Sequence, residues 1–145
     1  GKSSSDIQLV ADLTVDGETI PARNLSVVTR AENYDAYFGV DLDESKEGGT
    51  SVRVTGEQGW IAFKDADLGD QAAVIEARVS SEQPGAALEV RLDAADGTLA
   101  GRVDIAQSGA QQWSTVKAVL QGAAGQRDIY IILSAGVRIS HFEIR

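Results

Sequence analysis

The feature that most limits the fold is a strict alternation of apolar and charged side chains followed by a tight turn. In residues 87–93 the leucines and the valine share one face of an extended strand, and charged residues occupy the other face. The following turn contains Asp96 and Gly97, a pair that readily adopts the positive φ of a hairpin. The next apolar run, residues 98–105, is therefore predicted to pair antiparallel with residues 87–93.

The rest of the chain repeats this rhythm of short apolar runs separated by Gly, Asp, Asn or Ser clusters. The one stretch with good helix formers, residues 71–78, contains β-branched Val74 and Ile75 and is interpreted as a strand. Trp60 and Phe63 are predicted to be core residues. The other strand candidates are residues 7–13, 20–29, 50–54, 60–64, 113–120, 129–133 and 137–144. Strands without crossover helices predict an all-β fold, an antiparallel two-sheet β-sandwich (jelly roll) with little or no helix.

The chain divides into three parts. Residues 1–6, which include three consecutive serines, are interpreted as a linker or a remnant of cloning. Residues 7–27 are predicted to add N-terminal strands, either as a hairpin on the sandwich or as a strand paired with a neighbouring domain. Residues 28–145 are predicted to form one sandwich domain, since the total of 145 residues is typical of a single domain.

Charge and motif content argue against several classes of function. Asp and Glu number 22 against 13 Lys and Arg, and the net charge of -9 repels nucleic-acid phosphates and anionic lipid head groups. No apolar run approaches the roughly 20 residues of a membrane-spanning helix. The single histidine, His141, lies inside the last strand candidate, and no nucleophile elbow, Walker loop, dinucleotide fingerprint or zinc-ligand cluster is present. We therefore expect no nucleic acid, no membrane and no catalysis.

Several segments, in order, resemble the carbohydrate-binding modules of family 6 and the related family 35. The strongest is residues 87–103, where the alternating strand is followed by Gly-Thr-Leu-x-Gly-x-Val; the others are residues 30–34, 48–52, 59–69, 108–116, 127–133 and 137–144. The resemblance implies a galactose-binding-like β-sandwich that targets an attached glycoside hydrolase to a polysaccharide such as β-glucan, xylan or an agar-type algal glycan. It also implies a secreted or cell-surface protein, a catalytic domain in the same parent chain, and a monomeric module.

A sugar site needs an aromatic platform flanked by polar groups. Trp113 falls on the wetter face of its predicted strand and is the expected platform, unless a bulge at Gln112 turns the indole into the core. Tyr37 is the expected second ring. The resemblance places Arg53 and Arg138 where the family has an aromatic ring and an Asn, so these arginines and Gln112 are the expected polar contacts. Surface salt bridges are the alternative for both arginines.

The family often carries a structural calcium ion, and the resemblance matches Glu32 to one of its ligand positions. Arg30 and Ser140 occupy positions where further acids are usual, which leaves the ligand set short. No cofactor is expected to be required, and structural calcium remains an open alternative. Because Arg53 and Arg138 replace the aromatic ring and the Asn of the family's sugar site, a second function stays open. The module would then be a structural accessory domain that packs against a catalytic domain without binding sugar.

Overall fold

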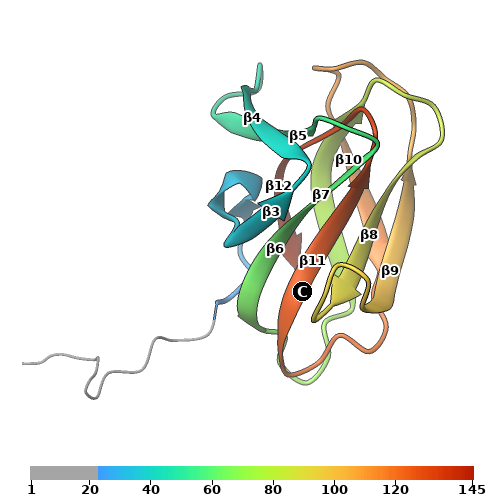
Figure 1. The fold of residues 1–145 in the computed structure, drawn as a ribbon. Helices are drawn as coiled ribbons and strands as arrows, with labels where there is room; N and C mark the ends of the chain where they lie inside the picture. The colour runs from blue at the N-terminus through green and yellow to red at the C-terminus, as the bar shows by residue number, and fades with distance from the viewer. Residues whose placement is uncertain (1–22) are drawn as a thin grey trace, which may run out of the picture.

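The computed structural model describes residues 23–145, which form two antiparallel β-sheets packed face to face (Figure 1). This architecture confirms the predicted β-sandwich. Within the described residues, the only helical segment is the 3-10 turn η1 (Ala31–Asn33). This part of the chain therefore contains no helix long and apolar enough to cross a membrane. The predicted linker and the strand candidate at residues 7–13 lie outside the described residues. The candidate at residues 20–29 is largely wrong where it is described, because residues 24–28 form no strand and Arg23 makes only an isolated bridge to Ala66.

The first sheet has six strands in the order β10-β7-β12-β5-β4, with β2 pairing with β12 beside this path. Its members are β2 (Thr29–Arg30), β4 (Val40–Glu44), β5 (Thr50–Val54), β7 (Val74–Ser81), β10 (Ser114–Val119) and β12 (Val137–Ile144). Residues 74–81 are a strand, as predicted. Strand β4 is not among the strand candidates predicted from the sequence, and it pairs in register with β5.

The second sheet has five strands in the order β3-β6-β11-β8-β9. Its members are β3 (Ala36–Phe38), β6 (Gln58–Asp67), β8 (Ala86–Leu92), β9 (Thr98–Ile105) and β11 (Gln126–Ser134). The predicted hairpin is confirmed, since β8 and β9 pair antiparallel from Leu92 opposite Thr98 to Ala86 opposite Ile105. The turn that joins them ends at Gly97, whose backbone N–H donates to the carbonyl of Ala94.

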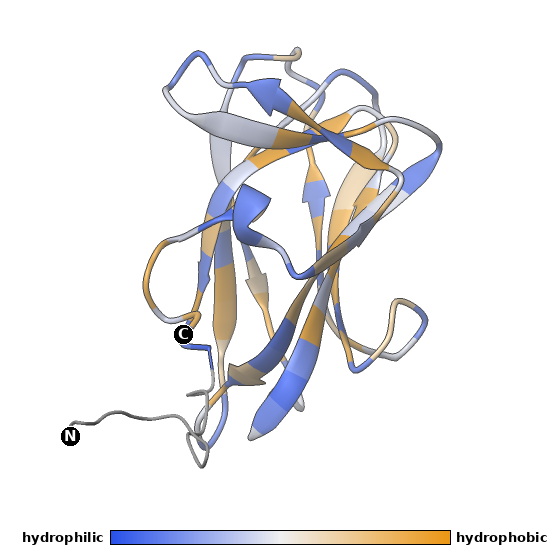
Figure 2. Ribbon diagram, turned by 60° about the vertical axis from the view of Figure 1, so that its left-hand side comes forward, coloured by the Kyte–Doolittle hydropathy of each residue, from blue (hydrophilic) through white to orange (hydrophobic). Residues whose placement is uncertain are grey.

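The core lies between the two sheets. Leu88, Val90 and Leu92 are all at most 2% exposed, so the alternation in β8 correctly identified its buried face. Phe63 of β6 meets Phe142 of β12 edge to face, with ring centroids 4.9 Å apart and both side chains at most 1% exposed. Hydrophobic stretches follow the strands of both sheets, and the connecting loops are mostly hydrophilic (Figure 2).

The two sheets approach each other closely along the side formed by β9 and β10. The backbone N–H of Gln121 donates to the carbonyl of Ala100 across this side, at 2.8 Å. A Cβ atom at Gly101 would lie 2.6 Å from the carbonyl oxygen of Val119 and 2.7 Å from a methyl group of Leu120. Glycine is therefore required at position 101, because any side chain would force β9 and β10 apart.

Candidate functional site

A second apolar cluster lies on the outer face of the five-stranded sheet, away from the core. Ala62, Tyr130 and Ile132 are 0%, 8% and 4% exposed, and Trp60 packs against them. Trp60 is therefore not a residue of the main core, contrary to the prediction. Successive side chains of a strand point to opposite faces, so the inward direction of Phe63 turns Trp60, three residues earlier, outward.

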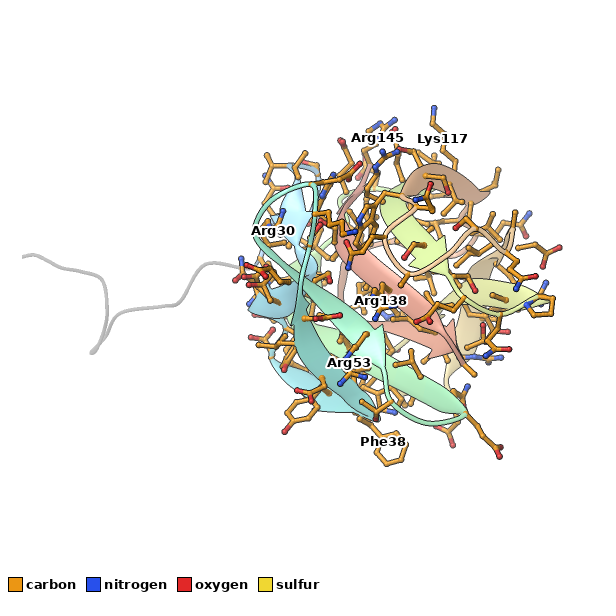
Figure 3. The ribbon with its side chains drawn as sticks, turned by 90° about the horizontal axis from the view of Figure 1, so that it is seen from above. Arg30, Phe38, Arg53, Lys117, Arg138 and Arg145 are labelled. Atoms are coloured by element: carbon orange, nitrogen blue, oxygen red, sulfur yellow. The ribbon has the colours of Figure 1, made fainter. Side chains whose placement is uncertain are left out.

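Three aromatic rings form a continuous surface on this face. The ring of Phe38 stacks on Trp60 with centroids 6.2 Å apart and an interplanar angle of 23°. Trp60 meets Tyr130 edge to face at 5.0 Å. Phe38 is 61% exposed, and its ring projects into solvent at the margin of the sheet (Figure 3). Trp60 is half-buried and Tyr130 is buried beneath it, so Phe38 and the open part of Trp60 are the ring surfaces suited to stack on the apolar face of a pyranose.

Strand register extends the aromatic surface into a row that crosses the whole sheet. Phe38 pairs with Trp60, Trp60 with Ile132, Ile132 with Glu89, and Glu89 with Arg102. Because paired residues point to the same face, this row places stacking surface at the β3 margin and charged groups at the β9 margin. The Arg102 Nε atom lies 3.7 Å from a carboxylate oxygen of Glu89.

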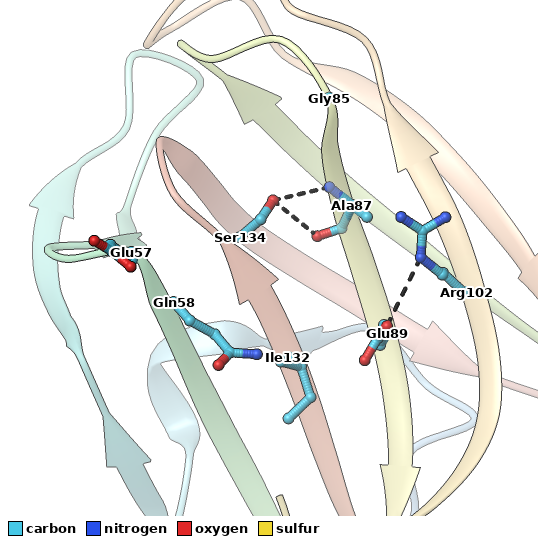
Figure 4. A pocket seen from close by; sticks show the side chains of 8 residues that line it. All are labelled: Glu57, Gln58, Gly85, Ala87, Glu89, Arg102, Ile132 and Ser134. Carbon is cyan, nitrogen blue, oxygen red and sulfur yellow. Dashed lines mark hydrogen bonds and ion pairs between the residues drawn. The ribbon is translucent and has the colours of Figure 1, made fainter. Parts of the chain in front are cut away.

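Beside this row the surface is hollowed by a pocket of about 360 Å³. Figure 4 shows its lining residues, which are Glu57, Gln58, Gly85, Ala87, Glu89, Arg102, Ile132 and Ser134. The hydroxyl of Ser134 in the lining accepts a hydrogen bond from the N–H of Ala87 at 2.9 Å and donates to the carbonyl of Ala87 at 3.3 Å. The pocket therefore places carboxylate, amide and guanidinium groups next to an aromatic surface, the composition that hydroxyl-rich ligands require.

Charged groups also border the aromatic surface on its other side. The Lys64 ammonium lies 3.0 Å from the hydroxyl of Tyr130 and 3.7 Å from a carboxylate oxygen of Asp128. These contacts raise the pKa of Lys64, through the Tyr130 hydroxyl first, and so favour its charged form. Arg91 donates to the carbonyl of Gly97 at 2.8 Å, which anchors this arginine to the β8–β9 turn.

Trp113, the expected platform, lies just before β10 and is half-buried. Its indole N–H donates to the side-chain oxygen of Gln111 at 3.1 Å. The same oxygen accepts from the N–H of Lys46 at 2.9 Å, and the Gln111 amide donates to the carbonyl of Glu44. Trp113 thus helps to fasten its loop to the β4–β5 loop, while the neighbouring Gln112 is exposed.

The two arginines of the expected site pair across β5 and β12 of the six-stranded sheet (Figure 3). The Arg138 side chain is only 13% exposed, and its guanidinium binds the carboxylates of both Asp43 and Glu82. Arg53 lies 3.7 Å from Asp41. Salt bridges, the alternative considered for both residues, are thus present at both. Whether either arginine contacts a glycan stays a prediction.

Tyr37 belongs to β3, at the margin of the other sheet. Its side chain is 58% exposed, and its ring lies 5.1 Å from that of Tyr34. The structure therefore divides the five expected site residues between the sheets. Arg53, Arg138, Gln112 and Trp113 lie on the six-stranded sheet or in the loop that leads into it, and Tyr37 lies on the five-stranded sheet.

Glu32, the residue matched to a metal-ligand position, lies on η1. Its carboxylate is 3.2 Å from the Nε atom of Arg30, with which it forms an ion pair. The described residues contain no group of three or more His, Cys, Asp or Glu side chains arranged to hold a metal ion.

Acid is expected to weaken the contact between Asp43 and Arg138. The pKa of Asp43 is lowered, first by the N–H of Glu44 and then by the guanidinium of Arg138. A carboxyl with a lowered folded-state pKa stabilises the fold above its unfolded pKa, near 3.9, and loses this contribution as the pH falls through the folded value. Arg138→Gln should therefore cost about 1 kcal/mol at pH 7, a figure discounted for the partly exposed carboxylates, and less at pH 3. Urea denaturation at both pH values measures the difference, and an equal cost at both would contradict it.

The chain matches a known protein family and parts of several known proteins. Residues 30–145 match the family model described as carbohydrate binding module (family 6). Endo-1,4-beta-xylanase A of Thermoclostridium stercorarium is 32% identical over 123 residues, which are 83% of this chain and 24% of that protein. The Clotting factor G alpha subunit of Tachypleus tridentatus is 32% identical over 75% of this chain and 17% of its own length. The chain thus spans about a quarter or less of the curated relatives it matches.

Solved structures give the same result. A β-1,3-glucan-binding family 6 module from Bacillus halodurans superposes with a TM-score of 0.79 at 28% identity, covering 86% of this chain and 99% of that one. A family 6 module from Clostridium cellulolyticum in complex with xylose gives 0.79 at 25% identity, covering 85% and 99%. With the family model matched across nearly all of the described residues, the chain belongs to carbohydrate-binding module family 6.

Proposed function

We propose that this module binds a polysaccharide on the outer face of its five-stranded sheet, without catalysing any reaction. The observation that carries the proposal is the row of paired residues from the rings of Phe38 and Trp60 to the charged Glu89 and Arg102. The rings present apolar surface to the faces of the sugars. The carboxylate and the guanidinium present hydrogen-bonding groups to the hydroxyls.

The relatives support a neutral, β-linked glycan as the ligand. The names of the matched proteins include an endo-1,4-beta-xylanase and an arabinoxylan arabinofuranohydrolase. Related modules were solved with xylose and with cellobiose, and another binds β-1,3-glucan. We propose that this module is likewise secreted as part of a polysaccharide-degrading enzyme. Tethering then raises the concentration of substrate around the catalytic domain.

The residues expected from the sequence define a second candidate position on the six-stranded sheet, around Trp113 and Arg138. Binding there has a cost that the five-stranded sheet does not impose. A sugar that engages Arg138 must compete with Asp43 and Glu82 for a guanidinium that is only 13% exposed. Such a sugar would have to replace charge-assisted hydrogen bonds that the arginine already makes. The five-stranded sheet is therefore the favoured face.

Retention on polysaccharides tests the proposed function. Native affinity gels containing xylan, a β-1,3-glucan, hydroxyethylcellulose or agarose should retard the module in at least one case, and calorimetry should give a saturable isotherm with the matching oligosaccharide. No reducing sugar should be released during prolonged incubation. Migration unchanged in every gel would instead favour the structural accessory domain, and release of reducing sugar would contradict the absence of catalysis.

A further inference from the structure

The corner formed by β2, η1 and the start of β5 is held by one guanidinium group. Arg30 donates from Nη2 to the carbonyl oxygen of Thr50 at 2.6 Å, and from Nε to the carboxylate of Glu32 at 3.2 Å. One side chain therefore links β2 and the adjoining turn η1 to β5, whose first residue lies 20 positions later in the sequence. Strand β2 itself pairs with β12 through Arg30 opposite His141, so the same corner also connects to the last strand.

The backbone at Gly49 is shaped around this group. An ideal Cβ atom at Gly49 would lie 2.6 Å from Nη2 and 3.2 Å from Cζ of Arg30, and the residue has a φ of +73°. Glycine adopts this φ without strain and leaves room for the guanidinium. Arg30 therefore occupies a specific position against the β4–β5 turn.

The residues at this corner do not fit a calcium ion. Calcium takes six to eight oxygen ligands, usually including several carboxylates. Here the carboxylate of Glu32 and the carbonyl of Thr50 already bind the guanidinium, whose positive charge would repel a second cation. Ser140, which the resemblance matches to a position where an acid is usual, is 1% exposed, and its hydroxyl lies 3.1 Å from Nδ1 of His141.

We propose that the Arg30 guanidinium serves as the cation of this corner, so that the module reaches its full stability without calcium. The group supplies a positive charge to a carboxylate and a carbonyl oxygen, the two kinds of ligand that a hard metal ion would use. Unlike a metal ion, it is covalently attached and cannot be removed by a chelator. The module is thus independent of the calcium concentration around it.

Thermal unfolding tests this proposal in the full 145-residue chain. The melting temperature of the wild type should agree within about 1 °C in calcium, in magnesium at equal ionic strength, and in EGTA, where a shift of about 4 °C would correspond to about 1 kcal/mol. Arg30→Gln should melt about 4 °C lower in all three solutions, because it loses the ion pair and leaves the carboxylate without its partner. Lys117→Gln, which removes the same charge from an exposed side chain on β10, is the matched control and should melt as the wild type does.

Arg30→Glu reverses the charge at position 30, so that two carboxylates face each other and an added cation is needed to stabilise the corner. This variant should melt below Arg30→Gln in EGTA, and calcium should raise its melting temperature by several degrees more than magnesium does. The proposal is overturned if calcium selectively stabilises the wild type by more than about 2 °C, or if Arg30→Gln melts at the wild-type temperature. It is also overturned if calcium leaves a folded Arg30→Glu variant unchanged. If Arg30→Glu does not fold, the wild type and Arg30→Gln decide the question.

Discussion

Trp60→Ala is expected to weaken polysaccharide binding by about 30-fold, which corresponds to about 2 kcal/mol. Trp60 lies between Phe38 and Tyr130, and its indole provides the largest ring in the proposed stacking surface. Trp60→Phe should retain part of the affinity, because a smaller ring still offers a flat apolar face. Calorimetry with the glycan that retards the wild type on gels gives the dissociation constants.

The matched control is Trp113→Ala, which removes the other tryptophan from the loop before β10. If the glycan lies on the five-stranded sheet, this variant should bind within about two-fold of the wild type, less than 1 kcal/mol. Circular dichroism of both variants checks that each one is folded. The opposite result, with binding lost in Trp113→Ala and kept in Trp60→Ala, would place the site at the residues expected from the sequence.

Phe142→Ala is expected to destabilise the fold by about 3–5 kcal/mol. Phe142 is 1% exposed, and its ring fills the space between the sheets against Phe63. Truncation of the side chain leaves a cavity between the two sheets. The sheets cannot close it, because every strand is held in register by the strands beside it. The urea midpoint should fall accordingly, with an unchanged dependence of the free energy on urea concentration.

Val119→Ala serves as the comparison, because Val119 is 72% exposed on β10. Its free energy of unfolding should stay within about 0.5 kcal/mol of the wild-type value. A loss in Phe142→Ala as small as that in Val119→Ala would contradict the close packing described between the sheets.

The fold could be predicted because its signals are local. The alternation in residues 87–93 and the following turn determine a hairpin within about 20 residues of sequence, and the buried face is visible in the pattern. The run at residues 129–133 lacks alternation because both of its faces are covered. Ile129, Ile131 and Leu133 face the core, while Tyr130 and Ile132 belong to the outer apolar cluster. A continuous apolar run is typical of such a strand.

The candidate site could not be predicted in the same way, because it depends on register between distant strands. The row from Phe38 to Arg102 runs through Ile132 and joins residues that lie up to 94 positions apart, and no local pattern reveals their pairing. The partners of Arg138, Asp43 and Glu82, are 95 and 56 residues away. One signal was available. Inward-facing Phe63 implies by strand alternation that Trp60 faces outward.

The close approach of β9 and β10 bears on how the module behaves at high concentration. Each of these strands ends its sheet, and an exposed last strand offers unpaired N–H and C=O groups to other molecules. Here the close approach of β10 at Gly101 and the hydrogen bond from the Gln121 N–H to the Ala100 carbonyl hold these two edge strands together. Each of these two edge strands thus shields the other from intermolecular strand addition on this side of the module.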